Sequence, residues 1–296
     1  MPTRAGNLAE SGGIGLNWAV LMESILLHLH LIPAALYTWL GLYFWRTRSV
    51  ATPNIPGMAR FERVLLVLGL LAHGFALQAM IFPGNEMRFG FSVAFSLAVW
   101  LAICFYWMET LYNRIDGLRA IVLPAGVLAC VLVVFFPDTH PLPQENVASP
   151  IFRLHLISFM LACGLVTLAA LHAMLMAIVT KQLHHGRFSR ALANLPSLLT
   201  MEAQLFRLIG IAFVLLTLAL LAGITYTETL SGKAFQFKHK TVFATISWFL
   251  FGILLIGRHF RGWRGRVALR WTLAGFITLM LAYVGSRFVI EVLLHR

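Results

Sequence analysis

Charged residues are scarce in this chain, since Asp, Glu, Lys and Arg together make up 11% of its 296 residues. An average soluble domain contains about 25%, because its surface must be solvated. Hydrophobic residues make up 59% of the chain. This composition excludes an ordinary soluble protein and indicates that most of the outer surface contacts a lipid bilayer.

Several patterns that carry chemistry in other proteins are also absent. The three cysteines (Cys104, Cys130 and Cys163) lie inside apolar runs, without the spacing of a metal site or a disulfide framework. No Ser/His/Asp set, nucleotide-binding loop or metalloprotease helix is present, so nothing predicts an enzyme. The net charge of +12 comes from basic residues in short loops, without interleaved aromatics, which argues against nucleic-acid binding.

What the sequence does contain is a series of long apolar runs. Each is long enough to cross a hydrocarbon core of about 30 Å as a helix. The eight runs cover Asn17–Trp45, Glu62–Phe82, Phe89–Met108, Leu118–Phe136, Pro150–Thr180, Gln204–Tyr226, Thr241–Gly257 and Val267–Leu294. The sequence therefore predicts an all-α, polytopic integral membrane helix bundle. A flexible tail (1–16) precedes a single transmembrane domain (17–296), with four helices in 17–136 and four in 150–296.

Basic residues predict the orientation of this bundle. The loops after the first, third, fifth and seventh spans hold most of the arginines, and the other loops hold few basic residues. The positive-inside rule therefore places both termini in the periplasm of a bacterial inner (cytoplasmic) membrane. Three lysines before the seventh span, Lys233, Lys238 and Lys240, are the exception on the outer side.

Histidines near the outer face are the candidate functional residues. His155 opens the fifth span, His295 lies at the outer end of the last span, and His73 falls in the middle of the second. His28 and His30 point to opposite sides of one helix, so at most one of them can face a common site. Ionisable groups inside a membrane are candidates for function. Imidazoles at one level suit axial ligation of a haem iron, but a proton path or a divalent metal ion would use them equally well.

Two runs of small residues, Gly69–Gly74 and Ala219–Gly223, allow close approach of neighbouring helices. An accessory subunit that packs against partner helices is therefore a further alternative.

Sequence motifs in the second half resemble a known family. They are Phe235-Gln-Phe-Lys-His-Lys-Thr-Val-Phe-Ala-Thr-Ile-Ser-Trp248, Arg261-Gly-Trp-Arg-Gly-Arg266, Gly275-Phe and Ala282-Tyr-Val-Gly-Ser-Arg-Phe288. Over roughly the last 145 residues the chain resembles the cytochrome c assembly (CcsA-type) family of haem-handling membrane proteins, and in particular its HemX/YpjD branch. In that family a tryptophan-rich outer segment, the WWD motif, cradles haem, and histidines in flanking outer regions bind the iron.

The resemblance implies a set of site residues. His155 and His295 match the outer iron ligands, and His73 resembles the intramembrane histidine of the N-terminal half. Phe235 and Phe237 stand where the family has tryptophans, and with Trp248 they would pack against the porphyrin. The candidates for pairing with the haem propionates are Arg153, Lys238, Lys240 and Arg287. Lys238 replaces the acid of the motif, so this WWD segment is degenerate.

These observations lead to one expected function and one alternative. The expected function is a haem-binding, non-catalytic inner-membrane protein that assists or regulates cytochrome c assembly or haem handling, alongside other membrane proteins of that process. The alternative is a transporter or metal-resistance protein that uses the same histidines for a divalent metal ion.

Overall fold

Eight long helices make up most of the described structure, a computed structural model that covers residues 28–49, 58–84, 86–112, 116–137, 139–184, 197–231, 239–285 and 288. They are α2 (Leu31–Ser49), α3 (Arg60–Ile81), α4 (Phe91–Tyr112), α5 (Arg119–Phe135), α7 (Pro150–His184), α8 (Leu198–Ser231), α9 (His239–Arg261) and α10 (Arg266–Met280). A π-helical turn, η3 (Leu281–Gly285), extends α10. The short elements are the 3-10 turn η1 (Asp116–Leu118), α6 (Gln144–Ala148) and the antiparallel strands β1 (Arg88–Phe89) and β2 (His140–Pro141). The predicted all-α class is confirmed.

Six of these helices are long and apolar enough to cross a membrane, judged over the described residues: α3, α4, α7, α8, α9 and α10 with η3. α5 is apolar but has only 17 residues, which is the short limit for a spanning helix. α2 does not belong to this set, and its last turn carries Arg46 and Arg48. Residues 17–27 of the first predicted span lie outside the described residues. The polytopic membrane bundle is thus confirmed.

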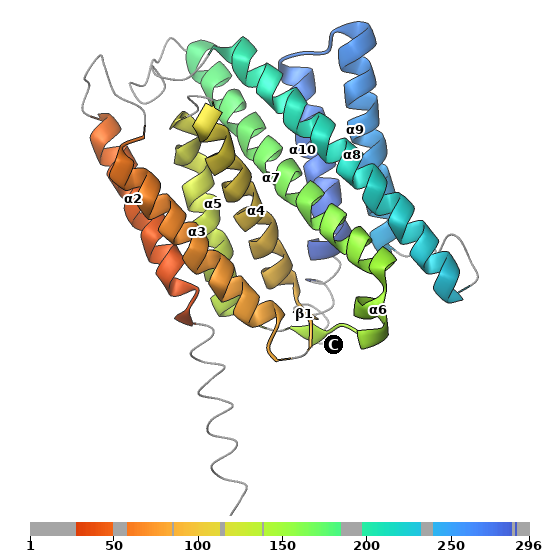
Figure 1. Cartoon of the computed structure of the whole chain (residues 1–296). Helices are drawn as coiled ribbons and strands as arrows, with labels where there is room; N and C mark the ends of the chain where they lie inside the picture. Colours follow the sequence, from red (N-terminus) through yellow and green to blue (C-terminus); the bar gives the residue numbers. More distant parts are fainter. Residues whose placement is uncertain are drawn as a thin grey trace, which may run out of the picture.

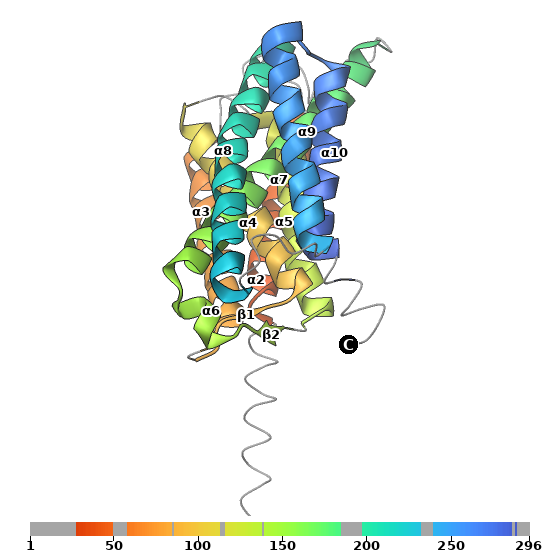
Figure 2. The ribbon, with the colours of Figure 1, turned by 90° about the vertical axis from the view of Figure 1, so that its right-hand side faces the viewer.

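The helices run alternately up and down, so their connections lie at two opposite ends of the bundle (Figures 1 and 2). At one end lie β1, β2 and α6, and we call it the ribbon end. At the other end α2, α4, α7 and α9 finish, and we call it the arginine-rich end because Arg119, Arg207 and Arg258 form ion pairs there. The positive-inside rule assigns the arginine-rich end to the cytoplasm.

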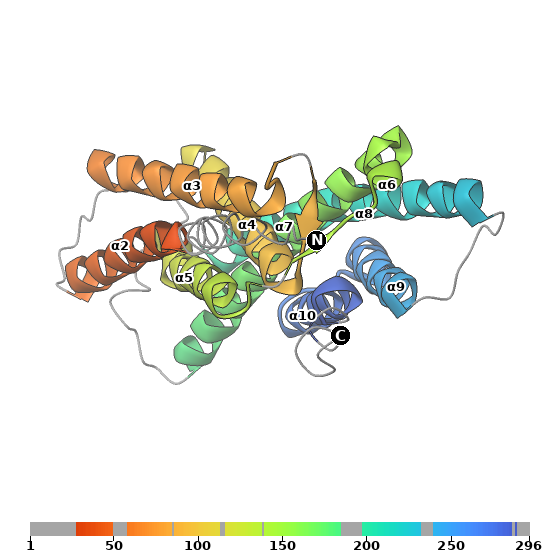
Figure 3. The same cartoon turned by 90° about the horizontal axis from the view of Figure 1, so that it is seen from below.

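α7 is the central helix of the bundle: α4, α5, α8 and α10 pack against it, while α2, α3 and α9 lie farther out (Figures 1 and 3). In its most apolar 18-residue stretch 83% of the residues are buried, against 56% or less in the other five spans. Gly164 allows α7 to approach α4 closely, since a Cβ there would lie 2.5 Å from the Cβ of Leu101.

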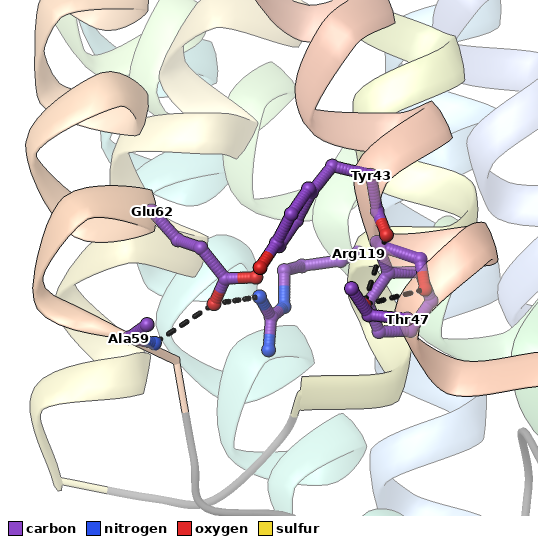
Figure 4. A network of polar contacts seen from close by, with 6 residues as sticks. Tyr43, Thr47, Ala59, Glu62 and Arg119 are labelled. Atoms are coloured by element: carbon purple, nitrogen blue, oxygen red, sulfur yellow. Dashed lines mark hydrogen bonds and ion pairs between the residues drawn. The ribbon is translucent and has the colours of Figure 1, made fainter. Parts of the chain in front are cut away.

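Three buried carboxylates hold helices together at the arginine-rich end. Glu62 of α3 pairs with Arg119 of α5 at 3.0 Å, and it also accepts the backbone N–H of Ala59 at 2.8 Å (Figure 4). The other two carboxylates belong to Glu109, which pairs with Arg207 at 2.8 Å, and Glu202, which pairs with Arg258 at 2.6 Å. A buried charge is costly unless it is paired, so these pairs fix how α3, α4, α5, α8 and α9 sit against one another.

Candidate functional site

A cavity of about 660 Å³ lies between α7, α8, α9 and η3, towards the ribbon end. This volume falls within the range of about 300–1,000 Å³ that is usual for small-molecule sites. Its walls are mostly apolar and aromatic, with a few polar groups, among them His155 and Lys240. Such a lining suits a largely apolar ligand that carries a few polar or charged groups.

Among the described residues, His155 is the histidine that lines this cavity, and α8 fixes its orientation. Its Nδ1 lies 2.7 Å from the carbonyl oxygen of Ala219. Because a carbonyl only accepts hydrogen bonds, Nδ1 carries the hydrogen, and Nε2 of the neutral ring keeps its lone pair. Histidines that bind metals usually donate their other ring N–H to a carbonyl in this way. The ring also lies nearly parallel to that of Phe159, with centroids 6.1 Å apart.

Gly223 provides the space that this arrangement needs. A Cβ at this position would lie 2.9 Å from Nδ1 and 3.0 Å from Cε1 of His155. Contacts of this length are shorter than normal van der Waals separation, so any larger residue would push the ring away from the Ala219 carbonyl. The small residues of Ala219–Gly223 predicted only a close approach of helices, and the group that approaches Gly223 is the imidazole of His155.

Trp248 closes the cavity on the side of the arginine-rich end. Its indole stacks on Phe213 of α8, with ring centroids 5.4 Å apart and planes inclined by 21°. Its Nε1–H donates to Oγ1 of Thr217 at 2.8 Å. Phe152, Phe159 and Phe249 add further aromatic wall. The indole is therefore held firmly enough to offer a defined surface to a flat ligand.

Lys240 supplies positive charge in the first turn of α9. It lines the cavity, and its Nζ lies 5.0 Å from the centre of the Tyr283 ring. Arg153, the other described candidate for pairing with an anionic group, does not line the cavity, and its Nε donates to the Val147 carbonyl at 2.6 Å. Of these two cations, Lys240 is therefore the one placed to meet an anionic group in the cavity.

His73 lies apart from this cavity, in a buried cluster formed by α2, α3 and α4. Its Nε2 is 2.9 Å from Oγ of Ser96, and its Nδ1 is 3.4 Å from the Tyr37 hydroxyl. The ring of His30 packs edge-on against it at 6.3 Å. His30 is buried and His28 is exposed, which agrees with the prediction that these two face opposite sides. Both nitrogens of His73 are thus engaged, which distinguishes it from His155.

The structure brings together His155, Trp248 and Lys240 of the predicted site residues. The predicted residues that lie outside the described part of the chain are His295, Phe235, Phe237, Lys238 and Arg287. Ala219 and Gly223 were not predicted as site residues. Among the described residues no group of three or more His, Cys, Asp or Glu side chains could hold a metal ion.

Comparisons with known proteins agree on one family. The family model described as "Cytochrome C assembly protein" matches residues 27–294. The "Inner membrane protein YpjD" of Escherichia coli (strain K12) is 30% identical over 236 residues, which are 79% of this chain and 88% of that protein. The "Cytochrome c biogenesis protein CcsA" of Chlamydomonas reinhardtii is 24% identical over 254 residues, covering 82% of this chain and 68% of that protein. The CcsA protein of Gloeobacter violaceus is 31% identical over 92 residues, covering 31% of this chain and 27% of that protein.

Proposed function

The chain belongs to the cytochrome c assembly protein family, and on this premise we propose that it binds haem and assists or regulates cytochrome c assembly or haem handling. The apolar helices, with the inner-membrane relative, make it a multi-pass inner-membrane protein. Family membership supports a role in cytochrome c biogenesis. The identity of the ligand and the way it is handled are the proposed part.

The oriented imidazole of His155 is the observation that carries the proposal. Nδ1–H is held by the Ala219 carbonyl, so the lone pair of Nε2 is available as an iron ligand. Haem bound in the cavity would supply an iron centre that accepts an imidazole as axial ligand. A histidine whose second nitrogen is already fixed by a backbone carbonyl has the donor arrangement that such an iron needs.

The rest of the cavity lining fits the remainder of the haem molecule. Its volume and apolar walls suit a flat macrocycle, and Trp248 with Phe159 offers aromatic faces for stacking. Lys240 would neutralise a propionate. Asn146 and the threonines on α8 and α9 add neutral polar groups, and none of the described lining residues is acidic.

We propose a binding or regulatory role rather than catalysis of haem attachment. In this chain Phe235 and Phe237 replace tryptophans of the family's haem cradle, and Lys238 replaces its acid. Phenylalanine keeps the stacking surface but lacks the indole N–H donor. The protein would then hold haem, or report its presence, for partner proteins of the same process.

Absorption spectroscopy of the purified protein tests haem binding directly. Titration of the detergent-solubilised protein with hemin should give a saturable Soret band, which His155→Ala greatly weakens. His259→Ala is the matched control, because His259 is exposed at the arginine-rich end and should bind as wild type does. Free imidazole should restore the ligated spectrum to His155→Gly. If wild type gives no saturable band, or His155→Ala binds as well as wild type, the proposed site is refuted.

A cellular assay tests the role in assembly separately. In a host that lacks its own copy of this gene, covalently bound haem in c-type cytochromes should fall, and wild type should restore it. His155→Ala should fail to restore it, whereas His259→Ala should succeed. Unchanged cytochrome levels in the deletion strain, at limiting and at ample haem, would refute the assembly role and leave the haem site standing.

A further inference from the structure

We infer that the cavity opens sideways into the bilayer between α8 and α9, so that its ligand enters from the lipid at the ribbon end and not from water. That the entering ligand is haem rests on the proposed function.

The wall formed by α8 and α9 can be reached from the lipid side. Leu221 of α8 and Phe249 of α9 both line the cavity, yet 59% and 55% of their surfaces are exposed. On a membrane-spanning helix an exposed apolar side chain faces the acyl chains. A lipid-soluble molecule moving along this surface would therefore meet the cavity without crossing a packed helix interface.

α8 and α9 touch on the side of the cavity that faces the arginine-rich end. There the Phe213–Trp248 stack joins them, and a Cβ on Gly252 of α9 would lie 3.4 Å from the Phe213 ring. Towards the ribbon end the two helices lie apart, as seen from below in Figure 3. The cavity occupies this wedge, so the described residues of the helix pair close it on one side and leave it open on the other.

A layer of residues covers the cavity on the aqueous side of the ribbon end. It consists of Phe89 of β1, Leu142, Asn146 of α6 and Phe152, all of which line the cavity. The Tyr226 hydroxyl donates to Oδ1 of Asn146 at 2.6 Å and so ties α8 to α6. The backbone N–H of Leu142 donates to the Met87 carbonyl at 2.8 Å. In the described part of the chain, a hydrogen-bonded layer therefore separates the cavity from water on this side, whereas no such layer lies between α8 and α9.

The polar groups along this opening suit an amphiphile that lies in one leaflet. Thr241 and Thr245 line the cavity from α9, and Lys240 lines it from the first turn of the same helix, at the ribbon end. A ligand with an apolar body and carboxylates at one edge could enter from the acyl chains while its carboxylates stay near the headgroups and Lys240. Haem has this shape and polarity.

Spin labelling in vesicles tests the opening without relying on haem. The background variant is Cys104→Ala, because Cys104 is the partly exposed native thiol while Cys130 and Cys163 are buried. Nitroxides are attached to Thr245→Cys in the cavity and, as control, to Ile253→Cys on the lipid face of the same helix, where the side chain is 42% exposed. Phe249→Cys is a second reporter at the mouth. Collision rates are measured with oxygen, which dissolves in lipid, and with a water-soluble nickel chelate.

The expected result is that the cavity and mouth labels collide more often with oxygen than with the nickel chelate, as the Ile253 label does. Hemin delivered from the vesicles should lower oxygen collisions at residue 245 and leave residue 253 unchanged. Nickel collisions that exceed oxygen collisions at residue 245 would overturn the lateral opening, even if a Soret band is seen. Oxygen access without any effect of hemin, and without a Soret band, would support the opening and refute the haem proposal.

Discussion

Replacing Gly223 by alanine should weaken haem binding while the fold is preserved. The new Cβ would lie 2.9 Å from Nδ1 and 3.0 Å from Cε1 of His155, and an ordinary contact between such atoms is about 3.5 Å or longer. The ring must therefore move by several tenths of an ångström or rotate. Either movement lengthens or breaks the 2.7 Å hydrogen bond to Ala219.

The size of the effect follows from the role of that hydrogen bond. Its loss alone costs about 0.5–1.5 kcal/mol, and removing the outer partner of a metal-ligating histidine typically lowers affinity by about 10–100-fold. We therefore expect hemin affinity of Gly223→Ala to fall by about 10–100-fold. The Soret band should also shift or broaden, because the remaining imidazole is no longer held in one orientation.

Gly210→Ala is the matched control for this prediction. It makes the same change on the same helix, but a Cβ there meets nothing within 4 Å. It should leave the hemin titration unchanged and stabilise α8 slightly, by up to about 1 kcal/mol, since alanine favours helix more than glycine does. If Gly223→Ala and Gly210→Ala give the same hemin titration as wild type, the Ala219 carbonyl and the space at Gly223 do not hold His155 in position for binding.

Three further predictions concern packing, each measured as the free energy of unfolding in detergent. Arg119→Leu should cost about 3–5 kcal/mol, because it leaves the Glu62 carboxylate buried and unpaired. Adding Glu62→Leu should recover most of that loss. If the losses of the two single variants instead add up in the double variant, the two residues do not form a direct pair. Gly164→Ala should cost about 1–3 kcal/mol by pushing α7 from α4, and an unchanged free energy of unfolding would show that the two helices are not in close contact. Trp248→Phe should cost only about 0.5–1.5 kcal/mol, since it removes the N–H donor and keeps the stack on Phe213. Trp248→Ala removes the stack as well and should cost about 3–5 kcal/mol. Equal losses for the two variants would mean that stacking contributes nothing.

Much of the architecture could be read from hydrophobic runs. The eight predicted spans correspond to the eight long helices, and their boundaries shift by a few residues at the ends that the structure describes, as where α8 begins at Leu198 instead of Gln204. The outer ends of the first and last predicted spans lie largely outside the described residues. Helix ends are harder to predict, because charged residues such as Glu202 continue a helix beyond the apolar stretch when a partner, here Arg258, neutralises them. The family was likewise recognisable from the motifs of the second half.

The candidate site was only partly predictable. His155, Trp248 and Lys240 were identified from the sequence, and the structure places all three around one cavity. The carbonyl of Ala219 and the missing side chain of Gly223 were not identified. A backbone acceptor and an absent Cβ leave no signature beyond a run of small residues, which is common in membrane helices.

The sequence by itself determined that this protein is a bundle of membrane-spanning helices, because bilayer thickness and backbone hydrogen bonding require long apolar helices wherever such runs occur. Only the tertiary structure decided that His155 faces a cavity while His73 lies in a closed cluster with Tyr37 and Ser96. Which imidazoles share a pocket depends on how each helix is rotated and which neighbour it packs against. These choices are made by contacts between residues far apart in the chain, such as that of His155 with Ala219.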